Sequence, residues 1–367
     1  MSVEIGQASD ATTLNTIVIP SKGRVQQLLA YLSYLSANQV SYPVMVLESG
    51  SHYPQLRTLF PALDLSHIRY DEEIPFFRKV ADGLGRVPTE FVSLCPDDDV
   101  TTSTGMRESV RFLSEHQDYS ACQGYHALFS ITGQVFNLVR VAWFTPSLDQ
   151  ADALARLNEL VRRYQPVCWA TFRTEAFRRT FDTVAKTDGL LFRELAWSAN
   201  TVLEGKVHRL PLVYCWRRLD DIQLLGHPLY AFIEEPSVFL DEFARYRDAL
   251  LKRLLQTSAL NDQALTRTLD LIHWRYFARE LDLGVMNFFT DTVLARPDAS
   301  IADVQVYNTV KPRPPNTESG WKAEAARGGR TYHVFPDMLD PQPCEEIHLP
   351  LSAFDDLLAD LDRYPLN

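Results

Sequence analysis

The chain has 367 residues, 46% of them hydrophobic and 23% charged, which is a composition typical of a folded protein with a large core. Its net charge of -11 argues against binding to a nucleic-acid backbone, because proteins that do so present a basic face. Five scattered cysteines without a C-x-x-C pair, no signal-peptide pattern and no apolar run of about 18 residues predict a cytoplasmic protein with reduced thiols and no membrane span.

Strands and helices alternate over the first hundred residues. Short apolar runs, several rich in β-branched residues, predict buried strands at 15–20, 43–47, 68–70 and 91–95. Apolar residues at helical spacing predict helices at 25–38 and 76–84. Strands that alternate with helices form parallel sheets, so this half of the chain predicts an α/β protein with a mostly parallel, doubly wound sheet.

The pattern changes after residue 100. Helices are predicted at 105–116, 151–164 and 189–204, and the region from about 230 to 290 is also helical in pattern. Strands are predicted at 119–125 and 134–144 as antiparallel additions, and at 206–210 and 212–216 on either side of Pro211. A proline-rich segment at 311–316 and a Gly-Gly pair at 328–329 predict a flexible lid or linker, and the tail ends in a predicted helix at 352–363. We therefore expect one domain at 15–228, a helical region at 229–310, and a linker and tail packed on the core at 311–367.

Three carboxylates, Asp97, Asp98 and Asp99, follow the fourth predicted strand. In open α/β sheets, ligands bind beyond the carboxyl ends of the strands, and polar clusters at 21–24 and 48–51 follow two other strands. Neighbouring carboxylates repel one another unless a cation lies among them, and hard oxygen ligands suit Mg²⁺ or Mn²⁺. The cluster therefore predicts a metal-bound, phosphate-bearing substrate, with an acidic surface loop as the alternative.

Several of these segments resemble one family. The segment at 16–24, TIVIPSKGR, resembles the first strand and turn of the large inverting family of GT-A fold glycosyltransferases, T-[IV]-[IV]-I-P-[TS]-x-[ND]-R, with Gly23 at the Asn or Asp position. The segment LESGS at 47–51 is similar to the family's V-D-[DN]-[GS]-S, with Glu48 in place of Asp, and the three aspartates at 97–99 look like its D-x-D.

The fourth similar segment lies further along the chain. FRELAW at 192–197, followed by LEGKV at 203–207, is similar to the family's E-D-x-[DE]-[LF] segment and the helix–Gly–strand that follows it. The resemblance covers about residues 15–220. It implies a GT-A fold, with a helical C-terminal extension, and a family-2-like inverting glycosyltransferase that uses a nucleotide sugar.

The resemblance implies a role for particular residues. A divalent cation, Mn²⁺ or Mg²⁺, would lie on Asp97 and Asp99, with His227 as a third ligand or phosphate contact, and which two of the three aspartates hold it stays open. Glu194 would be the general base, without the family's second acid because Leu195 replaces it. The residues implied to contact the nucleotide sugar are Pro20, Ser21, Arg24, Glu48, Asp71, Asp97 and Asp98.

Four further residues have two interpretations each. Arg217 and Arg218 could contact a diphosphate or form a surface pair, and Trp169 and Trp197 could stack on a sugar or belong to the core.

The implied partners are a nucleotide-diphosphate sugar donor and a glycan or other hydroxyl acceptor, in the setting of surface-glycan synthesis, and no nucleic acid. Membrane-surface association without a span and homodimerisation are left open. Two other functions remain as alternatives. One is a non-catalytic, glycosyltransferase-like binding protein. The other is a sugar nucleotidyltransferase, although the turn at 20–24 is shorter than the Gly-rich loop of that class and has a single glycine.

Overall fold

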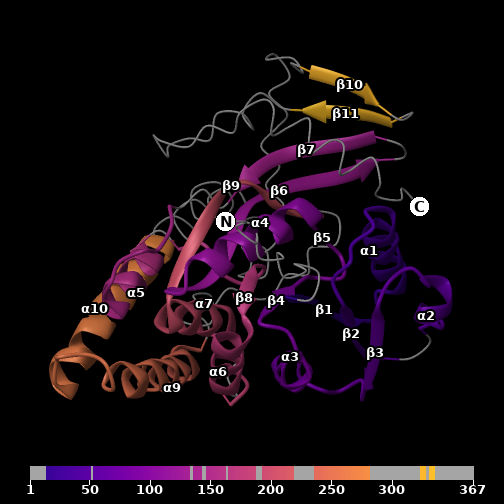
Figure 1. Ribbon diagram of the computed structural model, residues 1–367. Coiled ribbons are helices and arrows are strands. Elements are labelled where there is room, and N and C mark those ends of the chain that lie inside the picture. The colour runs from indigo at the N-terminus through magenta and orange to yellow at the C-terminus, as the bar shows by residue number, and fades with distance from the viewer. Residues whose placement is uncertain are drawn as a thin grey trace, which may run out of the picture.

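The computed structural model describes residues 14–50, 53–132, 135–142, 146–162, 164–186, 192–218, 235–281, 323–327 and 330–334. Within this part of the chain, one sheet of 11 strands runs through the molecule and helices cover both of its faces (Figure 1). The predicted α/β class is confirmed.

The first half of the sheet is parallel, as predicted. Its strands are β1 (Asn15–Lys22), β2 (Val44–Ser49), β3 (Leu65–Tyr70) and β4 (Phe91–Leu94), which lie in the order β3-β2-β1-β4. The chain moves outward from β1 to β3 and then returns to place β4 on the other side of β1. Such a reversal of strand order opens a crevice at the carboxyl ends of the two central strands, which is where ligands bind in this type of sheet.

The second half of the sheet is mixed. Strand β8 (Thr171–Arg173) joins β4 to β6 (Tyr119–Thr132), and β7 (Val135–Ala142) pairs antiparallel with β6 as predicted. The short β5 (Val100–Thr101) pairs with β9 (Lys206–Arg218), which runs parallel to β6.

One prediction about β9 was wrong. Residues 206–218 form a single strand that continues through Pro211, instead of two strands separated by it. The register with β6 shifts between Gln123 and Tyr125, so β9 carries extra residues around the proline, and a bulge of this kind accommodates a residue that cannot donate to the ladder. A Cβ at Gly124 would clash with the Leu212 carbonyl oxygen, so the close approach of the two strands requires glycine there.

The predicted linker also contains strands. Strands β10 (Ala323–Arg327) and β11 (Arg330–Val334) form a hairpin that extends the sheet beyond β7, at the edge opposite β3 (Figure 1). The predicted features at 311–316 and 352–363 lie outside the described residues.

The helices divide between the two faces of the sheet. Helices α1 (Val25–Ala37), α2 (Leu56–Leu59) and α4 (Ser103–Glu115) cover one face. The other face is covered by α3 (Phe76–Gly85), α5 (Ala153–Arg162), α6 (Thr174–Val184) and α7 (Arg193–Glu204), together with α9 (Pro236–Leu254) and α10 (Asp262–Leu281). Successive residues of β1 point to opposite faces, and all but the last, Lys22, are buried because both faces are covered. None of the helices in the described ranges is long and apolar enough to cross a membrane.

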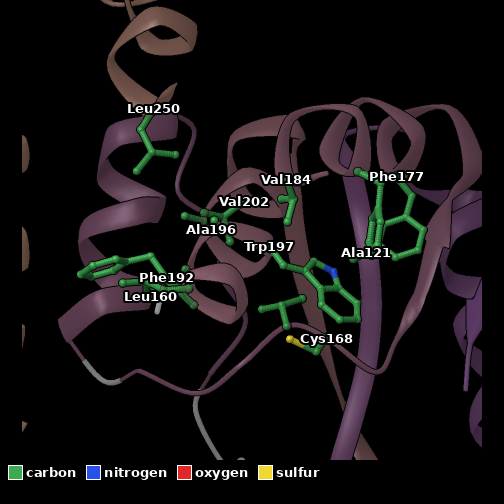
Figure 2. Packing of buried hydrophobic residues seen from close by; sticks show 14 of the residues in the cluster. Ala121, Leu160, Cys168, Phe177, Val184, Phe192, Ala196, Trp197, Val202 and Leu250 are labelled. Carbon is green, nitrogen blue, oxygen red and sulfur yellow. The ribbon is translucent and has the colours of Figure 1, made fainter. Parts of the chain in front are cut away.

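Helix α7 contributes to the hydrophobic cluster between the sheet and the second group of helices. Figure 2 shows Trp197 pointing into the cluster that also contains Phe177 and Cys168. Trp197 is only 3% exposed, and its ring lies 5.1 Å from that of Phe181 and 5.5 Å from that of Trp169. Trp197 therefore belongs to the core and is not available to stack on a sugar.

Helix α9 is fastened to the end of α7. Arg253 of α9 forms an ion pair with Glu204 and donates a hydrogen bond to Asn200 Oδ1 at 2.5 Å. Arg179 of α6 contacts the same Glu204 carboxylate at 2.6 Å. Helix α9 is thus attached to α7 through partly exposed polar contacts as well as through the aromatic core.

Candidate functional site

The strand-end segments predicted to form a site do meet in space. Ser21 of β1 lies beside Glu48 of β2 in the parallel register, and the aspartates follow β4 on the other side of β1. The turns after β1 and β2 contain Gly23 (φ 69°) and Gly50 (φ 112°), both in conformations that favour glycine. Asparagine also tolerates a left-handed backbone, so glycine at position 23 keeps the turn of the family pattern.

A chain of hydrogen bonds leads to Asp97. The Arg24 backbone N–H donates to the Tyr53 hydroxyl, which lies 2.7 Å from Ser21 Oγ, and Ser21 in turn donates to Asp97 Oδ2 at 2.6 Å. Arg24 Nη1 lies 3.3 Å from Asp97 Oδ1 and also pairs with Asp98. Burial raises the pKa of Asp97 to about 6, against the opposing effects of Ser21 and Arg24.

Asp99 is held by the end of β9. Arg217 Nε lies 3.3 Å from Asp99 Oδ2, and the backbone N–H of Arg218 donates to Oδ1 at 2.9 Å. Because Asp99 is only 5% exposed, burial raises its pKa to about 7, with a further increase from Asp98 and an opposing effect of Arg217. The pairing of β5 with β9 brings these arginines to the acidic cluster.

Glu48 is buried against the neighbouring strand. His67 Nε2 donates to Glu48 Oε2 at 2.5 Å, and Arg69 Nε lies 3.4 Å from the same oxygen. Both partners come from β3, where Arg69 stands opposite Glu48 in the register. Contact of Glu48 with a base or ribose stays a prediction, and in this structure its carboxylate is oriented by β3.

Lys79 is a site residue that sequence reasoning missed. It comes from α3, is 3% exposed, and its Nζ donates to the Ser21 carbonyl oxygen and to Ser49 Oγ, both at 2.8 Å. Burial lowers the pKa of Lys79 to about 8, and the negative charge of Asp97 opposes this effect. The available signal was its place on the inward stripe of α3, beside Val80 and three residues after Phe76.

Glu194 stands in the first turn of α7 with its side chain accessible to solvent. The Tyr164 hydroxyl donates to Glu194 Oε1 at 3.1 Å. Neighbouring protein atoms displace part of the water around the carboxyl group and so raise its pKa. The Tyr164 hydrogen bond and the charge of Arg217 lower it. The charge of Arg217 acts on both Asp99 and Glu194, and its Nε lies 3.3 Å from Asp99 Oδ2.

The other predicted residues are placed differently. Pro20 is buried in β1 opposite Leu47 and belongs to the core near the end of that strand. Asp71 is exposed after β3, where its Oδ1 accepts a hydrogen bond from the Glu73 N–H at 2.9 Å in a turn. Its contact with a nucleotide stays a prediction. His227 lies outside the described residues.

The carboxylate oxygens of this cluster are suitable ligands for a divalent cation that is shared with a substrate. Among the described residues, no three His, Cys, Asp or Glu side chains converge as metal ligands. Mg²⁺, however, is usually held by one or two carboxylates plus substrate phosphates. Burial raises the pKa values of Asp97 and Asp99 despite the neighbouring arginines, and the Asp98 side chain is the most exposed of the three at 17%. The donor set therefore suits Mn²⁺ or Mg²⁺ beside a diphosphate.

Comparison with known proteins supports the fold. No protein-family model matches the chain, and no curated protein matches its sequence. Among solved structures, S. aureus TarS 1–349 is 13% identical with a TM-score of 0.50, covering 81% of this chain and 78% of that one. TarS 1–349 in complex with UDP-GlcNAc is 14% identical (TM-score 0.48, coverage 81% and 79%). The mannosyltransferase PcManGT from Pyrobaculum calidifontis, in complex with GDP-Man and Mn²⁺, is also 14% identical (TM-score 0.39, coverage 74% and 88%). At 13% identity and a TM-score of 0.50, the similarity to TarS 1–349 shows the fold, which is the GT-A fold, as the sequence resemblance implied.

Proposed function

We propose that the chain is a metal-dependent glycosyltransferase that moves a sugar from a nucleotide-diphosphate sugar to an acceptor hydroxyl with inversion. One observation carries this proposal. At the carboxyl ends of β1 and β4, three aspartates are paired with Arg24 and Arg217. The same few side chains therefore offer carboxylates to a cation and guanidinium groups to an anion, which is the combination that a metal-diphosphate needs.

Binding of the donor would exchange these ion pairs. Arg24 and Arg217 would pass from the carboxylates to the diphosphate oxygens, because guanidinium groups bind phosphate through paired hydrogen bonds. Two of Asp97, Asp98 and Asp99 would then hold the cation, which when bound supplies Lewis-acid stabilisation of the diphosphate leaving group. Lys79 keeps the ends of β1 and β2 in place through Ser21 and Ser49.

Glu194 supplies the acceptor side of the reaction. Its carboxylate takes the proton of the acceptor hydroxyl while the hydroxyl oxygen bonds to the anomeric carbon. The bond from that carbon to the diphosphate breaks, and the nucleoside diphosphate leaves. A single displacement of this kind inverts the anomeric centre and needs one base. A carboxyl group with a raised pKa is better matched to that task near neutral pH than an ordinary glutamate.

The family resemblance extends the proposal to surface-glycan synthesis with a glycan acceptor. Membrane-surface association and a homodimer stay predictions, which vesicle sedimentation and light scattering of the full chain would test.

The test measures thermal unfolding with UDP, GDP, CMP and ADP, each with and without Mn²⁺. A ligand at a hundred times its dissociation constant adds about 2.7 kcal/mol to the free energy of unfolding, which such a scan resolves. We expect one nucleotide to stabilise the protein only with Mn²⁺, Asp99→Asn to abolish that effect, and Asp118→Ala, which removes an exposed aspartate, to leave it intact. The proposal fails if no nucleotide stabilises the protein. Binding without turnover, unaffected by Glu194→Gln, would favour the non-catalytic alternative.

A further inference from the structure

Tyr164 lies between Glu194 and the helical C-terminal region. Its hydroxyl donates to Glu194 Oε1 at 3.1 Å, and its ring meets that of Tyr276 on α10 edge-on, with 5.4 Å between centroids and 62° between planes. We propose that Tyr164 is the positioning residue of Glu194, and that Tyr276 holds Tyr164 in place. The role of Glu194 as general base, which Tyr164 serves, rests on the proposed function.

The hydrogen bond defines which oxygen of Glu194 reacts. With Oε1 accepting from Tyr164, Oε2 is the oxygen that takes the proton of the acceptor hydroxyl. The bond also stabilises the charged carboxylate, which is the form that acts as a base. Burial and the neighbouring Glu194 raise the pKa of Tyr164 well above the ordinary value, so its hydroxyl stays protonated and remains a donor.

The described groups that face Glu194 come from different elements. The hydrogen bond from Tyr164 lowers the pKa of Glu194, and so does the charge of Arg217 at the end of β9. Cys168, which precedes β8, also interacts with Glu194, but burial raises the pKa of its thiol well above the usual range and keeps it neutral. Tyr164 is therefore the neutral donor that sets the orientation of the carboxylate, and Arg217 is the charge that links it to Asp99.

Helix α10 supports this arrangement by two routes. Tyr276 is 6% exposed and contacts Tyr164 directly. The ring centroid of the next residue, Phe277, lies 6.0 Å from that of Phe192. Phe192 immediately precedes the first turn of α7, which carries Glu194. Adjacent residues of α10 therefore contact both Tyr164, which binds the Glu194 side chain, and Phe192, which precedes the turn that carries Glu194.

The first test needs no substrate. The full chain is labelled with ¹³C at the glutamate side-chain carboxyl carbon, the Glu194 signal is identified by its loss in Glu194→Gln, and its titration is followed by NMR. We expect the midpoint to move to higher pH in Tyr164→Phe, because the variant keeps the ring and loses the donor. Tyr276→Leu should move it in the same direction, since the ring that seats Tyr164 is gone.

The matched control is Tyr246→Phe. It removes another buried hydroxyl of the helical region, one that lies 2.8 Å from His273 Nε2, and should leave the Glu194 midpoint unchanged. An unchanged or lowered midpoint in Tyr164→Phe overturns the inference. So does an equal shift in the control. Neither outcome bears on nucleotide binding, which tests the proposed function separately.

The second test uses turnover of the nucleotide sugar that matches the bound nucleotide. Tyr164→Phe should lower kcat by about tenfold with little change in donor KM, as expected for loss of a hydrogen bond to a charged group. In a Glu194→Gln background the same substitution should have no further effect. An equal loss in both backgrounds would show that Tyr164 acts elsewhere. Full activity of Glu194→Gln would instead remove the base from the proposed function while leaving the titration result valid.

Discussion

Lys79→Met tests the cost in free energy of burying a charged amine beneath the ends of β1 and β2. The charged amine is 3% exposed, and its pKa falls from 10.5 to about 8 because burial disfavours the charge. At about 1.36 kcal/mol for each pKa unit, this fall corresponds to about 3 kcal/mol of native-state destabilisation below pH 8. Methionine has a similar length and removes that cost. It also leaves the Ser21 carbonyl and the Ser49 hydroxyl without this donor, at about 1–3 kcal/mol for each group. At pH 7 the two effects nearly cancel, and we expect the variant to be about as stable as wild type.

The difference between the two proteins should depend on pH in one direction. Between about pH 8 and 10.5 the unfolded state binds more protons at this lysine than the native state, so the stability of the wild type rises with pH there. Wild type should therefore gain about 3 kcal/mol over Lys79→Met across that window, as measured by urea unfolding at a series of pH values. The difference should be constant below pH 7. A difference that stays constant from pH 7 to 10.5, or that moves in favour of the variant, would refute the reasoning.

Three other predictions follow. Glu194→Gln should lower turnover by about a hundredfold or more while nucleotide binding in thermal unfolding is unchanged, and a loss of binding would contradict its acceptor-side role. Nucleotide stabilisation that depends on Mn²⁺ should weaken as pH falls below about 7, because protons compete with the cation for Asp97 and Asp99, whereas equal stabilisation at pH 5.5 and 8 would argue against these ligands. Gly124→Ala should destabilise the protein by about 1–3 kcal/mol in urea unfolding, since its Cβ clashes with a backbone carbonyl. Gly85→Ala, where no atom lies within 4 Å of the added carbon, is its control and should not destabilise.

Some partners of the acidic cluster at 97–99 could be predicted from the sequence and others could not. The sequence predicted a divalent cation among the carboxylates at 97–99. The structure shows Arg24 and Arg217 paired with them, and the metal stays a prediction. Arg24 follows the first strand, so its approach could be anticipated from a parallel sheet. The partnership of Arg217 with Asp99 depends on the pairing of β5 with β9, which no local pattern encodes.

Predictions of individual elements differed in accuracy for related reasons. Strands β1, β2 and β4 were predicted to within about two residues at each end, because strands buried on both faces form continuous apolar runs that stand out from their surroundings. Strand β9 was divided at Pro211, since a bulge that admits proline depends on the partner strand. The hairpin of β10 and β11 was missed because the proline- and glycine-rich composition around it favours a linker.

The sequence by itself determined the alternation of strands and helices, the resemblance to GT-A glycosyltransferases and the acidic end of β4. These features depend on neighbouring residues and on spacings of two or about four positions, which can be read along the chain. Tertiary structure alone decided that Lys79 is buried beneath two strand ends, that Arg218 meets Asp99 across 119 residues, and that Tyr164 joins α10 to Glu194. Each of those contacts depends on the docking of distant elements, and the free energy of docking comes from apolar surfaces whose partners the sequence order does not name.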